Sequence, residues 1–189
     1  MNSQLIFLSN FLRSPREIAA VAPSSRYVVD KVISQIDFGK ARLIVEYGPG
    51  TGILTKAILE RLKPNGKLVC FELNSKFCRH LASSLDDPRL TIINDSAEKL
   101  DFYLDKLKIK AKIDYALSSI PFLLIKDRRK HSIIRKTKDS LGKNGKFIVY
   151  QQYSWHIRNY LSFYFKKIST GFEIRNIPPT FIYRCEKAE

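Results

Sequence analysis

The chain has 189 residues, of which 44% are hydrophobic and 27% charged, values ordinary for one globular domain without a membrane-spanning helix or a secretory signal. Cys70, Cys78 and Cys185 form no CxxC pair and the histidines are scattered, which argues against a disulfide framework and against a zinc or other metal site. The 33 basic and 18 acidic residues give a net charge of +15, so we expect a polyanionic partner, either nucleic acid or an anionic membrane surface.

The N-terminal region predicts helices that precede a sheet domain. Residues 2–13 carry an apolar stripe, and residues 14–17 (SPRE) combine a capping serine, a proline at the first helical position and a glutamate that can cap back. Residues 23–25 (PSS) start a further helix that continues to Ile36. We therefore expect a single domain, residues 1–189, in which residues 1–39 form a helical cap or membrane-binding segment on a core of residues 40–189.

From residue 40 the pattern alternates between short apolar runs and segments with helical spacing. The expected strands are 43–47, 67–72, 90–94, 113–118 and 146–151, with two more in the tail from 168 to 184. The expected helices are 53–62, 76–85, 97–107, 123–141 and 154–165, the fourth being basic and ending at Gly142. Such alternation implies an α/β fold with a seven-stranded, mostly parallel sheet and helices on both faces.

Glycines follow the first strand of this core and precede its first helix. Gly48, Gly50 and Gly52 allow a tight turn and let a ligand approach the backbone closely. The helix that begins near Ile53 points its free N–H groups at this loop, where a carboxylate or phosphate is stabilised. The loop alone fits a nicotinamide cofactor, a flavin or S-adenosylmethionine.

Polar side chains at three consecutive strand ends separate these cofactors. Glu46, two residues before the first glycine, can accept a hydrogen bond from a ligand ammonium and would repel a pyrophosphate. Glu72 ends the second strand and suits a ribose diol, and residues 94–96 (NDS) end the third strand, where a side chain can reach an adenine amino group. Because ligands of open α/β sheets bind at the carboxyl ends of the strands, this set favours S-adenosylmethionine.

These segments resemble the motifs of class I S-adenosylmethionine-dependent methyltransferases, which have a Rossmann-like fold. Residues 45–55 are similar to motif I, residues 71–74 (FELN) to motif II and residues 94–97 (NDSA) to motif III. The resemblance implies S-adenosylmethionine as cofactor, S-adenosylhomocysteine as product and the following cofactor-binding residues: Glu46, Tyr47, Gly48, Pro49, Gly50, Thr51, Gly52, Glu72, Leu73, Asn74, Asp95, Ser96, Ala97 and Ser118.

The fourth strand ends in Ser118, Ser119, Ile120, Pro121 and Phe122, which resembles motif IV of the methyltransferases that act on amines. The proline stiffens the loop and would place the aromatic ring beside the transferable methyl, while a main-chain carbonyl and a small polar side chain hold the amine. The rRNA adenine dimethyltransferases usually carry Asn where this chain has Ser119. The bacterial phospholipid N-methyltransferases typically read Ser-Gly-Leu-Pro-Phe, which is nearer, although Ser119 departs from their glycine.

Both terminal segments are also similar to phospholipid N-methyltransferases. Residues 11–25 (FLRSPREIAAVAPSS) resemble their N-terminal signature, and residues 176–183 (NIPPTFIY) resemble their C-terminal Asn-x-Pro-Pro-Ala strand. The rRNA enzymes normally add a C-terminal helical domain, and this chain ends too early for one. The resemblance implies methylation of a phospholipid amine, phosphatidylethanolamine towards phosphatidylcholine. An rRNA adenine or a small-molecule amine remains an alternative acceptor. A non-catalytic protein that only binds membranes or RNA is a further alternative, but such a protein has little need for the intact motifs.

Further residues have possible roles at the acceptor side. Tyr27 and Tyr153 are candidates for a general base, and Phe122, Tyr153 and Trp155 could hold a quaternary ammonium or simply pack in the core. The N-terminal stripe with Phe7, Phe11, Arg13 and Arg16 could lie in an anionic membrane interface or pack over the cofactor site. Arg128 and Arg129 in the basic helix could grip lipid phosphates or RNA, or form a solvated face. We expect a cytoplasmic protein bound peripherally to the inner face of the membrane, with no obligate protein partner.

Overall fold

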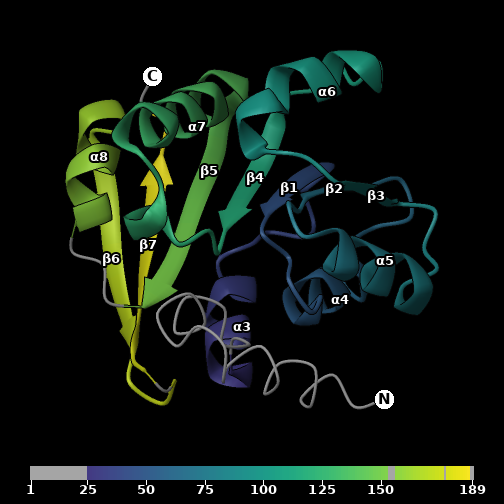
Figure 1. Cartoon of the computed structure of the whole chain (residues 1–189), viewed down its shortest axis with the longest axis horizontal. Coiled ribbons are helices and arrows are strands. Elements are labelled where there is room, and N and C mark those ends of the chain that lie inside the picture. The colour runs from purple at the N-terminus through teal and green to yellow at the C-terminus, as the bar shows by residue number, and fades with distance from the viewer. Residues whose placement is uncertain (1–24, 153–155, 177, 188–189) are drawn as a thin grey trace.

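A seven-stranded sheet forms the centre of the molecule (Figure 1). The computed structural model describes residues 25–152, 156–176 and 178–187. The strands lie in the order β3-β2-β1-β4-β5-β7-β6. Their bounds are β1 Leu43–Tyr47, β2 Lys67–Phe71, β3 Leu90–Ile93, β4 Ile113–Ser118, β5 Leu141–Gln152, β6 Lys167–Glu173 and β7 Thr180–Glu186. The α/β fold with a mostly parallel seven-stranded sheet is thereby confirmed.

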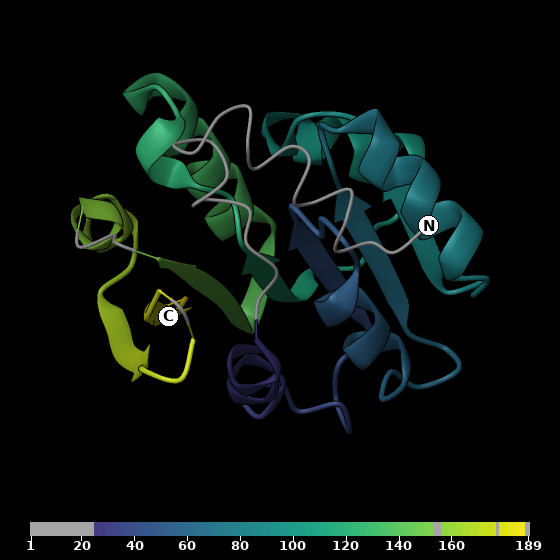
Figure 2. The same ribbon diagram turned by 60° about the horizontal axis from the view of Figure 1, so that its bottom comes forward.

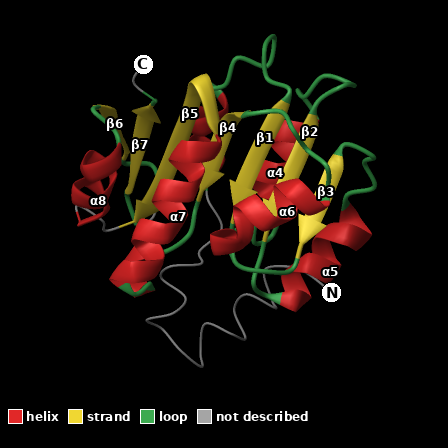
Figure 3. Ribbon diagram, turned by 90° about the horizontal axis from the view of Figure 1, so that it is seen from above, coloured by secondary structure: helices red, strands yellow, loops and turns green. Residues whose placement is uncertain are grey.

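Helices cover both faces of this sheet. They are α3 Arg26–Ile33, α4 Ile53–Leu59, α5 Ser75–Ser84, α6 Leu100–Lys106, α7 Asp127–Ser140 and α8 His156–Tyr164, with 3-10 turns η1 at Ala97–Lys99 and η2 at Phe122–Leu124. Apolar residues of α6, α7 and α8 pack in one core cluster, and those of α3 and α4 pack in a second cluster on the other face. In Figure 3, α6 and α7 accordingly lie in front of the sheet and α4 behind it.

All residues of β1 are buried, because the strand is covered on both faces. Leu43, Val45 and Tyr47 face the cluster under α7, whereas Ile44 faces the cluster under α4. By the same alternation Glu46 points to the α4 face. A charged residue at the end of β1 is therefore placed inside the protein and not at a solvated strand end.

The strand directions decide which loops lie together. β1 pairs in parallel with β2 and β4, β4 with β5, and β2 with β3. β7 is antiparallel to both β5 and β6, so β6 runs in the same direction as β5. The carboxyl ends of β1, β2, β3, β4, β5 and β6 consequently share one edge of the sheet. In Figure 1 the arrowheads of β4, β5 and β6 point to the bottom of the view, and Figure 2 brings this side forward. We call this edge the carboxyl edge.

The largest departure from the predicted elements is the basic helix. We expected a helix over 123–141, but Phe122–Leu124 form the 3-10 turn η2 and α7 begins only at Asp127. It ends at Ser140, because Leu141 is extended and pairs with Ile113 at the start of β5. A register shift then follows, and a Cβ at Gly145 would lie 2.7 Å from the carbonyl oxygen of Ile113. This close approach of two backbones is not visible in local helical spacing.

Several predictions lie outside the described residues. These are the helices expected before residue 25, together with Phe7, Phe11, Arg13, Arg16, Tyr153 and Trp155. The division into residues 1–39 and 40–189 stays a prediction. Within the described ranges, no helix combines the length and the apolarity needed to cross a bilayer.

Candidate active site

The glycine loop connects β1 to α4 in a conformation that only glycine adopts easily. Gly48, Gly50 and Gly52 have φ angles of +74°, +55° and +82°. A Cβ on Gly52 would lie 2.4 Å from Cδ2 of Leu81 in α5, so the loop is also closely packed. The N–H of Gly48 donates to the carbonyl oxygen of Phe71 at 2.8 Å, which ties the loop to the end of β2.

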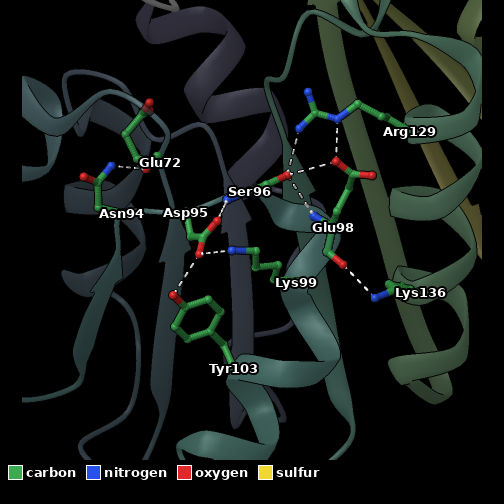
Figure 4. Close-up of polar contacts among 9 residues, drawn as sticks. All are labelled: Glu72, Asn94, Asp95, Ser96, Glu98, Lys99, Tyr103, Arg129 and Lys136. Carbon is green, nitrogen blue, oxygen red and sulfur yellow. Dashed lines mark hydrogen bonds and ion pairs between the residues drawn. The ribbon is translucent and has the colours of Figure 1, made fainter.

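Glu72, directly after β2, reaches the same loop. Its carboxylate accepts from the N–H of Gly50 at 3.2 Å and from the N–H of Asn74 at 2.8 Å. Asn94 at the end of β3 donates its side-chain amide to the carbonyl oxygens of Glu72 and Leu73, at 2.8 and 3.1 Å, and the first of these bonds is drawn in Figure 4. The three strand ends singled out in the sequence therefore meet, and Glu72 remains partly exposed to a ligand.

Glu46 lies beneath the loop and is only 1% exposed. Its Oε2 accepts from the Thr55 hydroxyl at 2.8 Å and from the Cys70 thiol at 3.5 Å, while Oε1 is buried and has no hydrogen-bond partner in the part of the chain that the structure describes. Burial raises the pKa of Glu46 to about 7, because the two donors are neutral and only partly offset the desolvation of the carboxylate. An orphaned buried acceptor oxygen beside a ligand loop is a group that a ligand cation would satisfy.

Thr55 and Cys70 had not been singled out from the sequence. Thr55 is in the first turn of α4 and fully buried, and Cys70 is the register partner of Glu46 in the β1–β2 ladder. The pairing of the two predicted strands was the signal that could have identified Cys70, because residues opposite each other in a sheet share a face.

Asp95 at the end of β3 is fully engaged by its neighbours (Figure 4). It accepts from Lys99 Nζ at 2.8 Å, from the Ser96 N–H at 2.7 Å and from the Tyr103 hydroxyl at 2.9 Å. These hydrogen bonds, above all the one from Lys99, lower the pKa of Asp95 to about 2. Contact of Asp95 with an adenine amino group stays a prediction, and such a ligand would share the carboxylate with three protein donors.

Arg129 in α7 has a different environment from the one the sequence suggested. Its guanidinium forms an ion pair with Glu98 and donates to the Ser96 hydroxyl at 3.3 Å, so it joins α7 to η1 (Figure 4). Lys136, about two turns further along α7, donates to the Glu98 carbonyl oxygen at 2.7 Å. Arg129 is therefore not a free cation. Arg128 is exposed, and no hydrogen bond or ion pair joins it to the described part of the chain.

The motif at the end of β4 touches the glycine loop directly. The Ser119 hydroxyl donates to the Gly48 carbonyl oxygen at 2.6 Å, and its N–H donates to the Tyr47 carbonyl oxygen at 3.1 Å. The buried Ser118 hydroxyl accepts from the Ile120 N–H at 3.3 Å, which curves the chain back over the strand end. Residues 118–122, which we call the acceptor loop after their predicted role, thus lie against the glycine loop.

Two aromatic side chains of the predicted site are buried. The ring of Phe122 is 1% exposed and packs in the core cluster under α7, and its place beside the transferable methyl stays a prediction. The side chain of Tyr47 also enters this core, where its hydroxyl hydrogen-bonds Thr137 at 3.0 Å, so only its main chain lies at the loop. Both follow from position, because Tyr47 ends a strand buried on both faces and Phe122 opens a turn packed under α7 and α8.

The remaining predicted residues line the loops or cap elements. Pro49 is buried, Thr51 is partly exposed, Leu73 is 67% exposed and Ala97 is buried. Asn74 caps α5 by accepting from the Lys76 N–H at 2.9 Å. No group of three His, Cys, Asp or Glu side chains within the described ranges is placed to hold a metal ion.

The ring of Tyr27 contacts two arginines. The guanidinium carbons of Arg175 and Arg26 lie 4.2 and 5.0 Å from its ring centroid. The N–H of Ser25 donates to the side-chain oxygen of Asn176 at 2.9 Å. Segments that are 151 residues apart in sequence, each resembling lipid-modifying enzymes, are thereby joined at the carboxyl edge.

Known proteins are similar in sequence to large parts of this chain. Residues 24–134, more than half of the chain, match the family model described as "Ribosomal RNA adenine dimethylase". An ornithine lipid N-methyltransferase of Singulisphaera acidiphila is 26% identical over 186 residues, which cover 98% of this chain and 96% of the relative. Ribosomal RNA small subunit methyltransferase A of Ureaplasma urealyticum is 29% identical over 106 residues; the match covers 50% of this chain and only 37% of that protein.

Solved structures share the fold. A putative rRNA methylase from Clostridium thermocellum superposes with a TM-score of 0.65 at 16% identity, over 87% of this chain and 98% of that one. The N-methyltransferase NodS from Bradyrhizobium japonicum superposes with a TM-score of 0.69 at 9% identity, over 87% and 96%. At these identities the likeness concerns the fold alone.

Proposed function

The chain belongs to the ribosomal RNA adenine dimethylase family of S-adenosylmethionine-dependent methyltransferases, and from this premise we propose that its methyl acceptor is the amine of a membrane-lipid head group. The chain is an N-methyltransferase with S-adenosylmethionine as cofactor and S-adenosylhomocysteine as product. The acceptor we propose first is phosphatidylethanolamine, methylated towards phosphatidylcholine. The reaction would take place at the anionic, cytoplasmic face of a membrane, to which the basic chain is attracted.

The observation that carries this proposal is the extent of the similarity. The lipid-modifying relative matches across 98% of the chain, whereas the rRNA enzyme matches across 50%. The family model itself stops at residue 134, before β5, β7 and β6. The Ser25–Asn176 hydrogen bond connects the two terminal segments that resemble phospholipid enzymes, and this supports reading them as one acceptor-binding unit.

The residues of the glycine loop fit the cofactor by their donors and acceptors. The orphaned Oε1 of Glu46 would face the ammonium of the methionine part, and Glu72 would accept from the ribose hydroxyls. The left-handed glycines leave the backbone open to close approach. When bound, S-adenosylmethionine supplies an electrophilic sulfonium methyl.

The contribution of the protein to the transfer is positioning. The head-group ammonium would first release its proton to water. The neutral amine, held by the acceptor loop, would then take up the methyl that a bound sulfonium supplies, with S-adenosylhomocysteine as the leaving product. Ser119 sets the distance between the acceptor loop and the glycine loop through its bond to Gly48. Carbonyl oxygens of the acceptor loop would hold the amine in line, since the Ser118 hydroxyl is already bonded to Ile120.

A second acceptor is favoured by a specific comparison. The full-length relative is named for an ornithine lipid, whose head group also joins an amine to an anionic group, so ornithine lipid ranks beside phosphatidylethanolamine. The family model favours an rRNA adenine, and a small-molecule amine is a further alternative.

The deciding experiment tests each class of acceptor in parallel. The protein and labelled S-adenosylmethionine are incubated in separate reactions with one acceptor each: liposomes of phosphatidylethanolamine, liposomes of ornithine lipid, unmethylated small-subunit rRNA or free ethanolamine. We expect label in lipid, loss of the signal in Glu72→Gln and full activity in Glu60→Gln, an exposed glutamate at the far end of α4. Label in RNA but in neither lipid would overturn the proposal.

Membrane binding by the N-terminal segment is a separate prediction. Phe7, Phe11, Arg13 and Arg16 lie outside the described residues, so it rests on their amphipathic pattern. In a flotation assay we expect binding to anionic vesicles that is lost when residues 1–12 are deleted. No binding, or binding that is unchanged by the deletion, would contradict a membrane role for this segment.

A further inference from the structure

A charged pocket opens at the carboxyl edge between the start of α3 and the end of β6. Its volume is about 540 Å³, and it is lined by Arg26, Tyr27, Asp30, Lys31, Glu173 and Arg175. Figures 1 and 2 both show α3 beside the carboxyl end of β6, and Lys31 Nζ donates to the Phe172 carbonyl oxygen at 2.6 Å. In the described ranges, the residues that line this pocket are separate from those that hydrogen-bond the glycine loop.

A buried carboxylate organises the cations of this pocket. The side chain of Glu173 is 3% exposed and accepts from Arg175 Nε at 2.7 Å, from Arg175 Nη2 at 2.8 Å and from the Arg175 N–H at 3.0 Å. Lys31 Nζ lies 3.8 Å from the same carboxylate. The hydrogen bonds from Arg175 lower the pKa of Glu173 to about 2, so it is ionised at neutral pH and holds both cations in place.

Tyr27 supports two guanidinium groups on its ring. Arg175 and Arg26 contact the ring at 4.2 and 5.0 Å, and a stacked guanidinium keeps the N–H groups at its edge available for an oxyanion. Arg26 is exposed, and Arg175 spends only part of its donors on Glu173. Three cations face two carboxylates around the pocket, and Glu173 is already engaged with Arg175, which leaves Asp30 at the exposed rim as the remaining acid.

The position of the pocket relates it to the acceptor. β6 runs parallel in direction to β5, so Glu173 and Arg175 lie on the same edge as the glycine loop and the acceptor loop. Both residues fall outside residues 24–134, the part shared with the rRNA family. The basic residue expected to grip phosphate, Arg129, is instead paired with Glu98.

We propose that this pocket binds the oxyanion of the acceptor head group, the phosphodiester of phosphatidylethanolamine or the carboxylate of an ornithine lipid, while the amine is presented to the acceptor loop. The assignment rests on the proposed function. Arg26 and Arg175 would donate to the oxyanion, Lys31 would add its charge, and Tyr27 would support the guanidinium groups. Tyr27 is then a positioning residue and not a general base.

The test measures binding separately from turnover. Binding of glycerophosphoethanolamine, of ethanolamine and of inorganic phosphate is measured by calorimetry on the full chain with S-adenosylhomocysteine present. The variants are Arg26→Gln, Arg175→Gln and the matched control Arg61→Gln, an exposed arginine beyond α4 at the opposite edge. Arg26→Gln is the main variant because the Arg26 side chain is exposed, and its hydrogen bond and its ring contact are both made to Tyr27. Thermal unfolding checks that Arg175→Gln is folded.

We expect the wild-type protein to prefer glycerophosphoethanolamine to ethanolamine by about tenfold, the size of one charge-assisted hydrogen bond, and Arg26→Gln to lose that preference. The apparent KM for lipid in mixed micelles should rise by a similar factor with an unchanged cofactor Kd. Competition by inorganic phosphate would identify a general oxyanion site that also serves phosphodiester lipid. Equal binding of glycerophosphoethanolamine and ethanolamine, or equal effects of Arg26→Gln and Arg61→Gln, would contradict the proposal that this pocket binds an oxyanion. A loss in Arg26→Gln confined to rRNA methylation would assign the pocket to nucleic acid.

The two proposals fail separately. If the wild-type protein methylates neither lipid, the proposed function is wrong, whereas the preference for glycerophosphoethanolamine still decides whether the pocket binds an oxyanion. If lipid is methylated and Arg26→Gln has the wild-type lipid KM, the pocket is wrong and the function stands.

Discussion

The two halves of the carboxyl edge differ in charge. The first half, at β1 and β2, contains the carboxylates of Glu46 and Glu72, and we call it the cofactor half. The second half, between α3 and β6, is lined by Arg26, Lys31 and Arg175. Each half contains a buried glutamate. Among the described residues, Thr55 and Cys70 are the donors to Glu46, and its pKa rises to about 7. Glu173 has Arg175 and Lys31 beside it, and its pKa falls to about 2.

The difference shows that burial alone does not determine the charge of a carboxyl group. Desolvation favours the neutral acid, and a neighbouring cation reverses this preference. In the first half no cation of the described ranges pairs with Glu46, and the cofactor would supply one. In the second half the cations are supplied by the protein, so the anion would come from the acceptor. Although the whole chain has a net charge of +15, acidic and basic side chains are thus separated along the carboxyl edge.

The largest effect is expected from breaking the first half at its loop. In Gly52→Ala the residue must keep a φ of +82° with a Cβ that lies 2.4 Å from Leu81 Cδ2. We expect strain of about 1–3 kcal/mol, which would weaken cofactor binding by up to about 100-fold if it displaces the loop. Calorimetric titration with S-adenosylhomocysteine measures this.

Gly142→Ala is the control for that variant, because its Cβ meets only ordinary contacts of 3.5 and 3.7 Å. Equal cofactor affinity in the two variants would contradict the role of Gly52 in the loop.

The next effect sharpens the contrast between the two glutamates. The folded-state pKa of Glu46, about 7, is above its ordinary value of 4.5, so the folded state binds the proton more tightly. Stability from this group is fully present below pH 4.5 and lost as pH rises to 7, by as much as about 3 kcal/mol. Glu46→Gln should therefore gain stability relative to wild type between pH 5 and pH 8 in denaturant titrations.

Cofactor binding offers a second readout of Glu46. A ligand ammonium favours the ionised carboxylate, so wild-type affinity should increase from pH 6 to pH 8 and that of Glu46→Gln should change less. Parallel pH profiles of the two proteins would show that Oε1 does not meet the ligand cation.

For Glu173 in the second half, we expect stability to depend on pH with the opposite sign. The folded-state pKa of Glu173, about 2, lies below its ordinary value of 4.5, so its contribution to stability is present above pH 4.5 and lost as pH falls towards 2. Glu173→Gln should lower the Tm by a few degrees at pH 7, and the deficit should shrink in acid. A deficit that is independent of pH would mean that the variant loses packing and not an ion pair.

The smallest effect concerns the link between η1 and α7. Arg129→Gln removes a partly exposed ion pair, and such pairs contribute about 0–1 kcal/mol. We expect an almost unchanged Tm and a cofactor Kd raised by about two- to fivefold, because Ser96 and Glu98 lose a cross-link. Arg128→Gln is the matched control. Equal cofactor Kd values for the two variants would show that Arg129 does not contribute to cofactor binding.

Much of the cofactor half was predictable because its determinants are local. Apolar runs mark the strands, and three glycines between a strand and a helix mark the loop with its left-handed backbone. Glu46, Glu72 and Asn94 lie at strand ends, and parallel strands bring their carboxyl ends to one edge. The burial of Phe122 and the pairing of Arg129 were not predictable in this way, since each depends on how α7 packs over the sheet.

The sequence by itself determined the fold class, the cofactor loop and the order of the motifs, because hydrophobic period, glycine placement and strand direction act over short stretches of chain. Only the tertiary structure decided which charges are free. Lys31 meets residues 172–173, and Ser25 meets Asn176, through contacts that span about three quarters of the chain. Electrostatic partners are set by distance in space, so the cationic pocket became visible only when α3 was packed against β6.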